Sequence, residues 1–207
     1  MGSRPAHGQN VLLNRRVCYG LRVMPSLGAD PQSSAQIEAG VDEQRPTRVL
    51  LISGMPASGK STFVEWLGEK GWGTAIGDEM LPGSLVQVAW EAAIRHGDDG
   101  ALLSAVAADS REFAIEFGFP AAFLPNVQNL MRRGFEGWFF DADLAASRTA
   151  WMAARPSADI GLWERQVDGL VAIHADIAAA YGGRLIKTLT DEDGHVPLTK
   201  IAQLTGT

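Results

Sequence analysis

One stretch of the sequence, residues 50–62, constrains the fold more than any other. It runs from an apolar segment through a glycine-bounded loop into a helix start, and it fills the pattern G-x-x-x-x-G-K-[ST] completely. Glycine permits backbone conformations that a Cβ would block, so successive N–H groups can turn inward around an anion. A helix that begins near Gly59 directs its unpaired N–H groups at the same anion. The stretch therefore predicts a strand, a phosphate-binding loop and a helix in succession.

Two residues of this loop have specific predicted roles. Lys60 is expected to reach the β- and γ-phosphates of a nucleotide, and the Ser61 hydroxyl to ligate Mg²⁺. The flanking segments favour this interpretation over an ordinary glycine-rich turn, because 48–52 is typical of a buried parallel strand and 61–71 of a helix ended by glycine. The predicted nucleotide-contacting residues are Gly54, Met55, Pro56, Ala57, Ser58, Gly59, Lys60, Ser61 and Thr62.

The composition limits the class of protein. Hydrophobic residues make up 46% of the chain, which is enough for a core, and no apolar run approaches the roughly 20 residues of a membrane span. The 18 lysines and arginines against 24 acidic residues give a net charge of −6, so the broad basic field of a nucleic-acid binder is missing. Cys18 is the only cysteine, which excludes an intramolecular disulfide and favours a cytoplasmic location.

The chain is expected to contain one domain preceded by an extension. Residues 1–46 include a stretch rich in Gly, Ser, Pro and Gln, so we expect a flexible N-terminal extension there. From residue 47 to residue 207, strand-like and helix-like patterns alternate, including one long helix predicted over 162–181. This alternation predicts an α/β domain with a doubly wound, five-stranded parallel sheet and helices on both of its faces.

Carboxylates occur near the ends of two predicted strands, 73–76 and 113–119. Ligands of an open parallel sheet bind beyond the carboxyl ends of its strands, so Asp78 and Glu116 are expected to face the phosphate loop. Asp78 is the candidate base that takes the proton of an acceptor hydroxyl. The alternative is that Asp78 serves only as a helix cap or a turn residue after the strand. Glu116 is a candidate metal ligand, with a structural carboxylate at a strand end as the alternative.

These features resemble the small P-loop kinases of the nucleoside-monophosphate, shikimate, gluconate and chloramphenicol phosphotransferase type, which have the fold of P-loop containing nucleoside triphosphate hydrolases. The resemblance covers about residues 47–204. It rests on the complete loop Gly54–Thr62, the strand end Gly77-Asp78-Glu79, the turn Glu116-Phe117-Gly118-Phe119-Pro120, and the run 138–143 followed by helical arginines. The turn differs from the D-G-F-P pattern of adenylate kinases because Phe117 occupies the Asp position, which leaves the identity of the metal-organising carboxylate open.

The resemblance implies a kinase that uses ATP and Mg²⁺ to phosphorylate a hydroxyl of a small molecule, such as a sugar, an aminocyclitol, a nucleoside or a natural product. Arg148 and Arg155 are seven residues apart and look like the arginines of a lid, here near 155–161, which neutralise charge on the transferring phosphoryl group. A solvated helix face paired with Asp143 or Asp159 is the alternative. The nucleotide base is expected near 188–194.

Two further functions stay open from the sequence. One is an ATP-binding switch NTPase that acts through a protein partner, for which the N-terminal extension would be the effector surface. The other is a zeta-toxin-like kinase of a nucleotide sugar. For the kinase, the expected partner is a small-molecule acceptor, with neither nucleic acid nor membrane involved, and the expected state is a monomer or a homodimer.

Overall fold

The phosphate-loop strand lies inside a single sheet in the computed structural model of the chain. The model describes residue 46 and residues 48–107, 110–118, 121–157 and 159–207, and the sheet formed by these residues has six strands in the order β2-β3-β1-β4-β5-β6. Neighbouring strands among the first five pair in parallel, and β6 pairs antiparallel with β5. The strands are β1 (Arg48–Gly54), β2 (Gly73–Ile76), β3 (Glu112–Glu116), β4 (Glu136–Ala142), β5 (Leu185–Thr190) and β6 (Gly194–His195).

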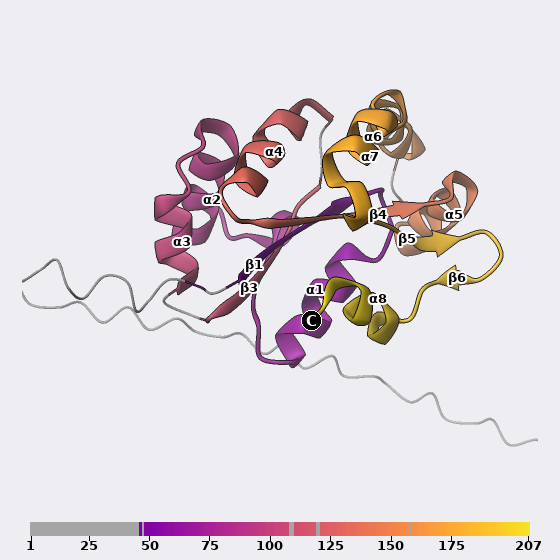
Figure 1. The fold of residues 1–207 in the computed structure, drawn as a ribbon. Helices are drawn as coiled ribbons and strands as arrows, with labels where there is room; N and C mark the ends of the chain where they lie inside the picture. Colours follow the sequence, from indigo (N-terminus) through magenta and orange to yellow (C-terminus); the bar gives the residue numbers. More distant parts are fainter. Residues whose placement is uncertain (1–45, 47, 108–109, 119–120, 158) are drawn as a thin grey trace, which may run out of the picture. The chain divides into compact units, whose positions relative to one another are not determined.

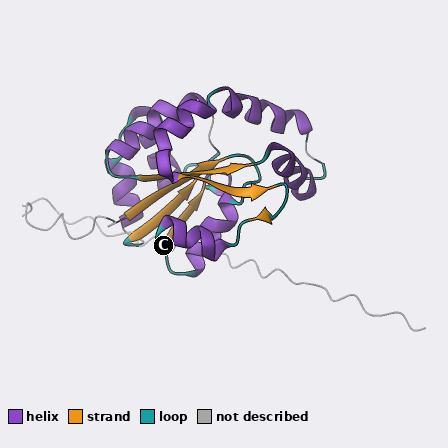
Figure 2. Ribbon diagram, turned by 45° about the vertical axis from the view of Figure 1, so that its right-hand side comes forward, coloured by secondary structure: helices purple, strands orange, loops and turns teal. Residues whose placement is uncertain are grey.

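Helices cover both faces of this sheet (Figure 1). Helices α1 and α8 lie on one face, while the helices from α2 to α4, with α6 and α7, lie on the other (Figures 1 and 2). The helices are α1 (Lys60–Glu69), α2 (Leu85–His96), α3 (Gly100–Ala107), α4 (Leu124–Arg132), α5 (Leu144–Ala154), α6 (Ile160–Ala172), α7 (His174–Tyr181) and α8 (Leu198–Thr205). No helix within these described ranges is both long and apolar enough to span a bilayer.

Strand β1 contributes side chains to two hydrophobic cores, because successive side chains of a strand point to opposite faces of the sheet. Leu51 packs in the larger core, whereas Leu50 and Ile52 pack in the smaller core with Phe63 of α1. All four side chains are fully buried. The apolar run before the phosphate loop is therefore buried on both faces, as expected for a central parallel strand.

The predicted doubly wound α/β fold is confirmed, with three corrections. The sheet gains the two-residue strand β6, which the sequence did not predict. The helix predicted over 162–181 is two helices, because Ile173 (φ −114°, ψ 17°) leaves the helical conformation between α6 and α7. The third strand ends at Glu116, and Phe119 and Pro120 of the predicted turn lie outside the described residues. Residues 1–45 of the predicted extension also lie outside them, so that domain boundary stays a prediction.

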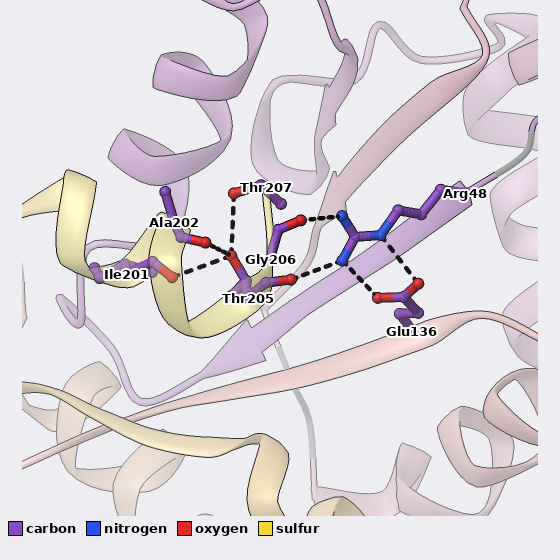
Figure 3. A network of polar contacts seen from close by, with 7 residues as sticks. All are labelled: Arg48, Glu136, Ile201, Ala202, Thr205, Gly206 and Thr207. Carbon is purple, nitrogen blue, oxygen red and sulfur yellow. Dashed lines mark hydrogen bonds and ion pairs between the residues drawn. The ribbon is translucent and has the colours of Figure 1, made fainter.

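Arg48 connects the starts of two strands with the end of the last helix (Figure 3). Its guanidinium binds the Glu136 carboxylate twice, with Nε 3.0 Å from Oε1 and Nη2 2.8 Å from Oε2. It also donates to the carbonyl oxygens of Thr205 and Gly206 at 2.7 and 2.8 Å. A cation at a helix C-terminus satisfies carbonyls that have no partner within the helix. Arg48 therefore connects the C-terminus of α8 to the end of the sheet at which β1 and β4 begin.

We expect Arg48→Ala to lower the free energy of unfolding by about 2 kcal/mol, because several charge-assisted hydrogen bonds are lost while solvent can still reach the site. Urea denaturation measures this change. Arg184→Ala is the matched control, since Arg184 is an exposed arginine on the same domain. Equal stabilities of the two variants would show that the Arg48 network contributes nothing.

Candidate active site

The loop between β1 and α1 has the backbone conformation that its glycines permit. Gly54 has φ +145° and Gly59 has φ +86°, and between them Ala57 has φ +56°. At Gly54 a glycine is required for space as well, because a Cβ there would lie 2.2 Å from the carbonyl oxygen of Phe140 on β4. The Met55 amide donates to that same oxygen at 2.9 Å. The close approach of β1 and β4 thus sets the direction in which the chain enters the loop.

Side chains from three elements hold the carbonyl groups of the loop. Ser147 of α5 donates to the Pro56 carbonyl at 2.7 Å, and Thr188 of β5 donates to the Ser58 carbonyl at 2.8 Å. The Lys60 ammonium donates to a third carbonyl, that of Met55, at 2.9 Å. The buried indole of Trp163 on α6 in turn donates to Ser147 at 3.1 Å. Hydrogen bonds to its carbonyl groups therefore hold the loop in place, and its amide groups are available to bind a ligand.

The amide side of the loop is suited to bind an anion. Among the described residues, the backbone N–H groups of Ala57, Gly59 and Lys60 have no hydrogen-bond acceptor. Helix α1 begins at Lys60 without a side-chain cap, so its first N–H groups are open too. Unpaired amides at a helix N-terminus combine hydrogen-bond donors with the positive end of the helix dipole. The loop therefore has the donors and the polarity of a phosphate cradle.

Lys60 adds a cation to this cradle, in an environment that disfavours charge. Only 8% of Lys60 is exposed, and burial lowers the pKa of its ammonium group, an effect that the charges of Glu116 and Asp78 oppose. Glu116 is 4% exposed, and burial raises the pKa of its carboxyl group, while the charge of Lys60 counteracts that rise. Burial makes the positive charge of this ammonium group costly, and nearby carboxylates offset only part of that cost. A polyphosphate carries more negative charge and would stabilise the ammonium group further.

A cavity of about 910 Å³ lies beside the loop. Asp78 lines it from η2 (Gly77–Glu79), and Glu116 lines it from the end of β3. Met55 and Ser58 do not line the cavity, because their side chains are buried beneath the loop. The predicted nucleotide-contacting residues that do line it are Gly54, Pro56, Ala57, Gly59, Lys60, Ser61 and Thr62. The structure thus brings the loop and both candidate carboxylates to one site.

Only one of the two predicted lid arginines lines the cavity. Arg155 lines the cavity, and its guanidinium lies 4.2 Å from the ring centroid of Trp151. Arg148 is exposed on α5 and does not line the cavity, so its expected place in the site is not supported. Helix α5 ends at Ala154, and Arg155 (φ −135°, ψ 68°) is no longer helical. Arg155 precedes Pro156, and a residue before proline avoids the α-helical conformation.

Several other polar residues line the cavity without having been predicted. They lie on three elements, and the set comprises Gln87, Glu91 and Arg95 on α2, Arg165 and Gln166 on α6, and His195 on β6. Those on α2 follow one another at intervals of four residues, a spacing that the sequence contains and that puts them on one helix face. The position of His195 depends on the pairing of β6, which has no local sequence signal.

The residues present offer a Mg²⁺ ion only one or two protein ligands, as is typical of nucleotide sites. Ser61 and Glu116 line the same cavity, and no group of three or more His, Cys, Asp or Glu side chains in the described part of the chain could hold a metal. Mg²⁺ usually takes one or two protein oxygens and completes its shell with water and phosphate oxygens. A hydroxyl and a carboxylate beside a phosphate cradle match that requirement.

Comparison with known proteins gives likenesses only at the level of structure. No protein-family model matches the chain, and no curated protein matches it. A shikimate kinase from Bacteroides thetaiotaomicron has 14% sequence identity and a TM-score of 0.49, over 77% of this chain and 99% of that chain. A gluconokinase from Sinorhizobium meliloti 1021 has 18% identity and a TM-score of 0.42, over 77% and 90%. A dephospho-CoA kinase from Campylobacter jejuni has 10% identity and a TM-score of 0.36, over 76% and 93%. Likenesses at these values assign no activity to the chain.

Proposed function

We propose that this chain is an ATP-dependent kinase that transfers the γ-phosphoryl group to a hydroxyl of a small molecule. The observation that carries the proposal is the continuity of the cavity. The phosphate cradle with Lys60 and the carboxylates of Asp78 and Glu116 line it, and so do side chains of α2, α5 and α6. A protein that only binds and hydrolyses ATP as a switch needs no room for a second molecule beyond the γ-phosphate, so this cavity favours a transferase.

The residues at the cradle supply the charges that the reaction needs. The loop amides and Lys60 hold the phosphate chain, and Arg155 stabilises charge on the transferring group. Bound Mg²⁺, held through Ser61 with Glu116 nearby, would neutralise charge on the β- and γ-phosphates. Asp78 accepts the proton of the acceptor hydroxyl as the new O–P bond forms. The bond from the γ-phosphorus to the β-phosphate oxygen breaks at the same time, and ADP leaves.

The test is acceptor-dependent release of ADP from Mg·ATP. A panel of hydroxylated metabolites is incubated with the protein, and mass spectrometry identifies any compound that gains one phosphoryl group. A kinase should release ADP many-fold faster with its acceptor than without. Binding of Mg·ATP with no transfer to any compound, and acceleration by a protein partner instead, would favour the switch. A product that is a phosphorylated nucleotide sugar would favour the zeta-toxin-like activity.

We expect Asp78→Asn to lower kcat by about 10²-fold or more, because the amide cannot accept the hydroxyl proton. Affinity for an ATP analogue should change little. Glu79→Gln is the matched control, since Glu79 is the neighbouring exposed carboxylate and does not line the cavity. A wild-type turnover number for Asp78→Asn would remove Asp78 as the base and would leave the rest of the site intact.

A further inference from the structure

The cavity continues along helix α2 for a considerable distance. Gln87, Glu91 and Arg95 all line it from this helix. With a rise of about 1.5 Å per residue, the eight steps along the helix from Gln87 to Arg95 span about 12 Å. An acceptor with a single six-membered ring is much shorter than this wall. An acceptor with one ring would therefore not reach every polar side chain with which α2 lines the cavity.

Several small residues on other elements also line the cavity. They are Ala121 and Ala122 of η3 (Ala121–Phe123), Ala150 and Ala154 of α5, and Gly169 of α6. The volume of about 910 Å³ is close to the upper end of the range of about 300–1,000 Å³ that is usual for ligand pockets. The size therefore accommodates a long acceptor together with the end of the phosphate chain.

Two of the arginines that line this cavity have their guanidinium groups over aromatic rings. The Arg95 guanidinium lies 5.7 Å from the ring centroid of Phe123, and that of Arg155 lies 4.2 Å from that of Trp151. Within the described ranges, neither arginine forms an ion pair. A guanidinium that is attracted to the face of an aromatic ring keeps its N–H donors. Both arginines can therefore donate hydrogen bonds to oxygen atoms of a ligand.

The wall that carries Arg95 also carries an acceptor of hydrogen bonds. The Glu91 carboxylate lies one helical turn before Arg95, and the Gln87 amide donates to it. A phosphate or carboxylate at Arg95 would approach this negative charge, which costs free energy. A hydroxyl both donates and accepts, so a row of hydroxyls can bind Glu91 and Arg95 together. The alternation of donor and acceptor thus favours a neutral polyol over an anion at this end.

We infer that the acceptor is a polyhydroxylated molecule of at least two linked rings, an inference that rests on the proposed kinase function. The acceptor lies lengthwise along α2. Its reacting hydroxyl is at Asp78, and its remote ring binds between Glu91 and Arg95. Contacts to the remote ring help to hold the reacting hydroxyl in line with the γ-phosphate, so they contribute to turnover as well as to binding.

The test compares paired acceptors that differ by one ring. Glucose is paired with maltose, and an aminocyclitol with its monoglycoside, and kcat/KM is measured for each by ADP release. We expect the two-ring member of the productive pair to exceed its single-ring partner by about tenfold or more. Arg95→Ala and Glu91→Ala should each reduce that ratio towards one, by about tenfold for a lost hydrogen bond to a charged group. Arg132→Ala is the control, because Arg132 is an exposed arginine in the last turn of a helix that does not line the cavity.

The outcomes separate this inference from the proposed function. Equal or better use of the single-ring partner, or an unchanged ratio in both α2 variants, overturns the two-ring acceptor while the kinase stands. Phosphorylation of other compounds with no transfer to any polyol of the panel also overturns it. Failure to bind Mg·ATP refutes the kinase itself. Thermal melts of both α2 variants, compared with that of Arg132→Ala, show whether a reduced ratio comes from loss of folded protein.

Discussion

Replacement of Lys60 with alanine should abolish phosphoryl transfer and leave the fold intact. We expect kcat/KM to fall by about 10³-fold, because the variant loses the one cation that the loop itself directs at the phosphate chain. The melting temperature should change little. Burial lowers the pKa of this ammonium group, so the folded state already disfavours its charge, and removing that cost offsets the loss of the hydrogen bond to the Met55 carbonyl.

Two measurements make this expectation specific to the site. Lys200→Ala removes an exposed lysine of α8 and should retain both activity and stability. Titration with a fluorescent Mg·ATP analogue should show weaker binding for Lys60→Ala than for Lys200→Ala. Turnover by Lys60→Ala close to that of the wild-type protein would be fatal to the assignment of this loop as a catalytic phosphate site, whatever the acceptor is.

The centre of the fold could be predicted from sequence because its signals are local. Strand β1 is a continuous apolar run, and the glycines after it mark the loop and the start of α1. Helix α2 carries its own boundaries, since Ser84 accepts a hydrogen bond from the Gln87 amide and Gly97 (φ +72°) ends the helix. Serine at the start of a helix and glycine after its end are both signals that can be recognised in a sequence. A segment with capping residues and strong hydrophobic periodicity can be predicted without knowing which other segments it packs against.

The parts that could not be predicted depend on contacts between distant residues. Strand β6 has only two residues and exists through its pairing with β5. The break at Ile173 falls within an apolar, helix-compatible run, so no local residue type indicates it. Arg148 and Arg155 were both predicted as lid arginines from their resemblance to those of known kinases, and only Arg155 lines the cavity.

The candidate site also has a part that could be predicted from the sequence and a part that could not. The loop and the carboxylates of Asp78 and Glu116 follow strands, and the topology of a parallel sheet brings strand ends together. The acceptor side is formed by α2, α5 and α6, whose arrangement follows from packing. The residues that would choose the acceptor were therefore present in the sequence without any pattern that grouped them.

Among the glycine-to-alanine substitutions in the domain, we expect Gly54→Ala to lower the free energy of unfolding the most. The added Cβ would lie 2.2 Å from the Phe140 carbonyl oxygen, which belongs to the neighbouring central strand. Relief of this clash requires β1 and β4 to separate, and the hydrogen bond from the Met55 amide to the same oxygen would be lost. We expect a loss of about 3–5 kcal/mol in the free energy of unfolding, from overpacking together with backbone strain at φ +145°.

Gly71→Ala is the control that separates the two causes. Gly71 also has a positive φ, +95°, but a Cβ there would meet no atom within 4 Å. That variant should lose only the cost of the left-handed backbone, about 1–2 kcal/mol, and should bind the Mg·ATP analogue normally. Gly54→Ala should lose analogue binding even at temperatures where it remains folded, because the loop would enter the site from a displaced strand. Similar urea midpoints for the two variants would contradict the close β1–β4 approach, and with it the geometry from which the phosphate cradle is built.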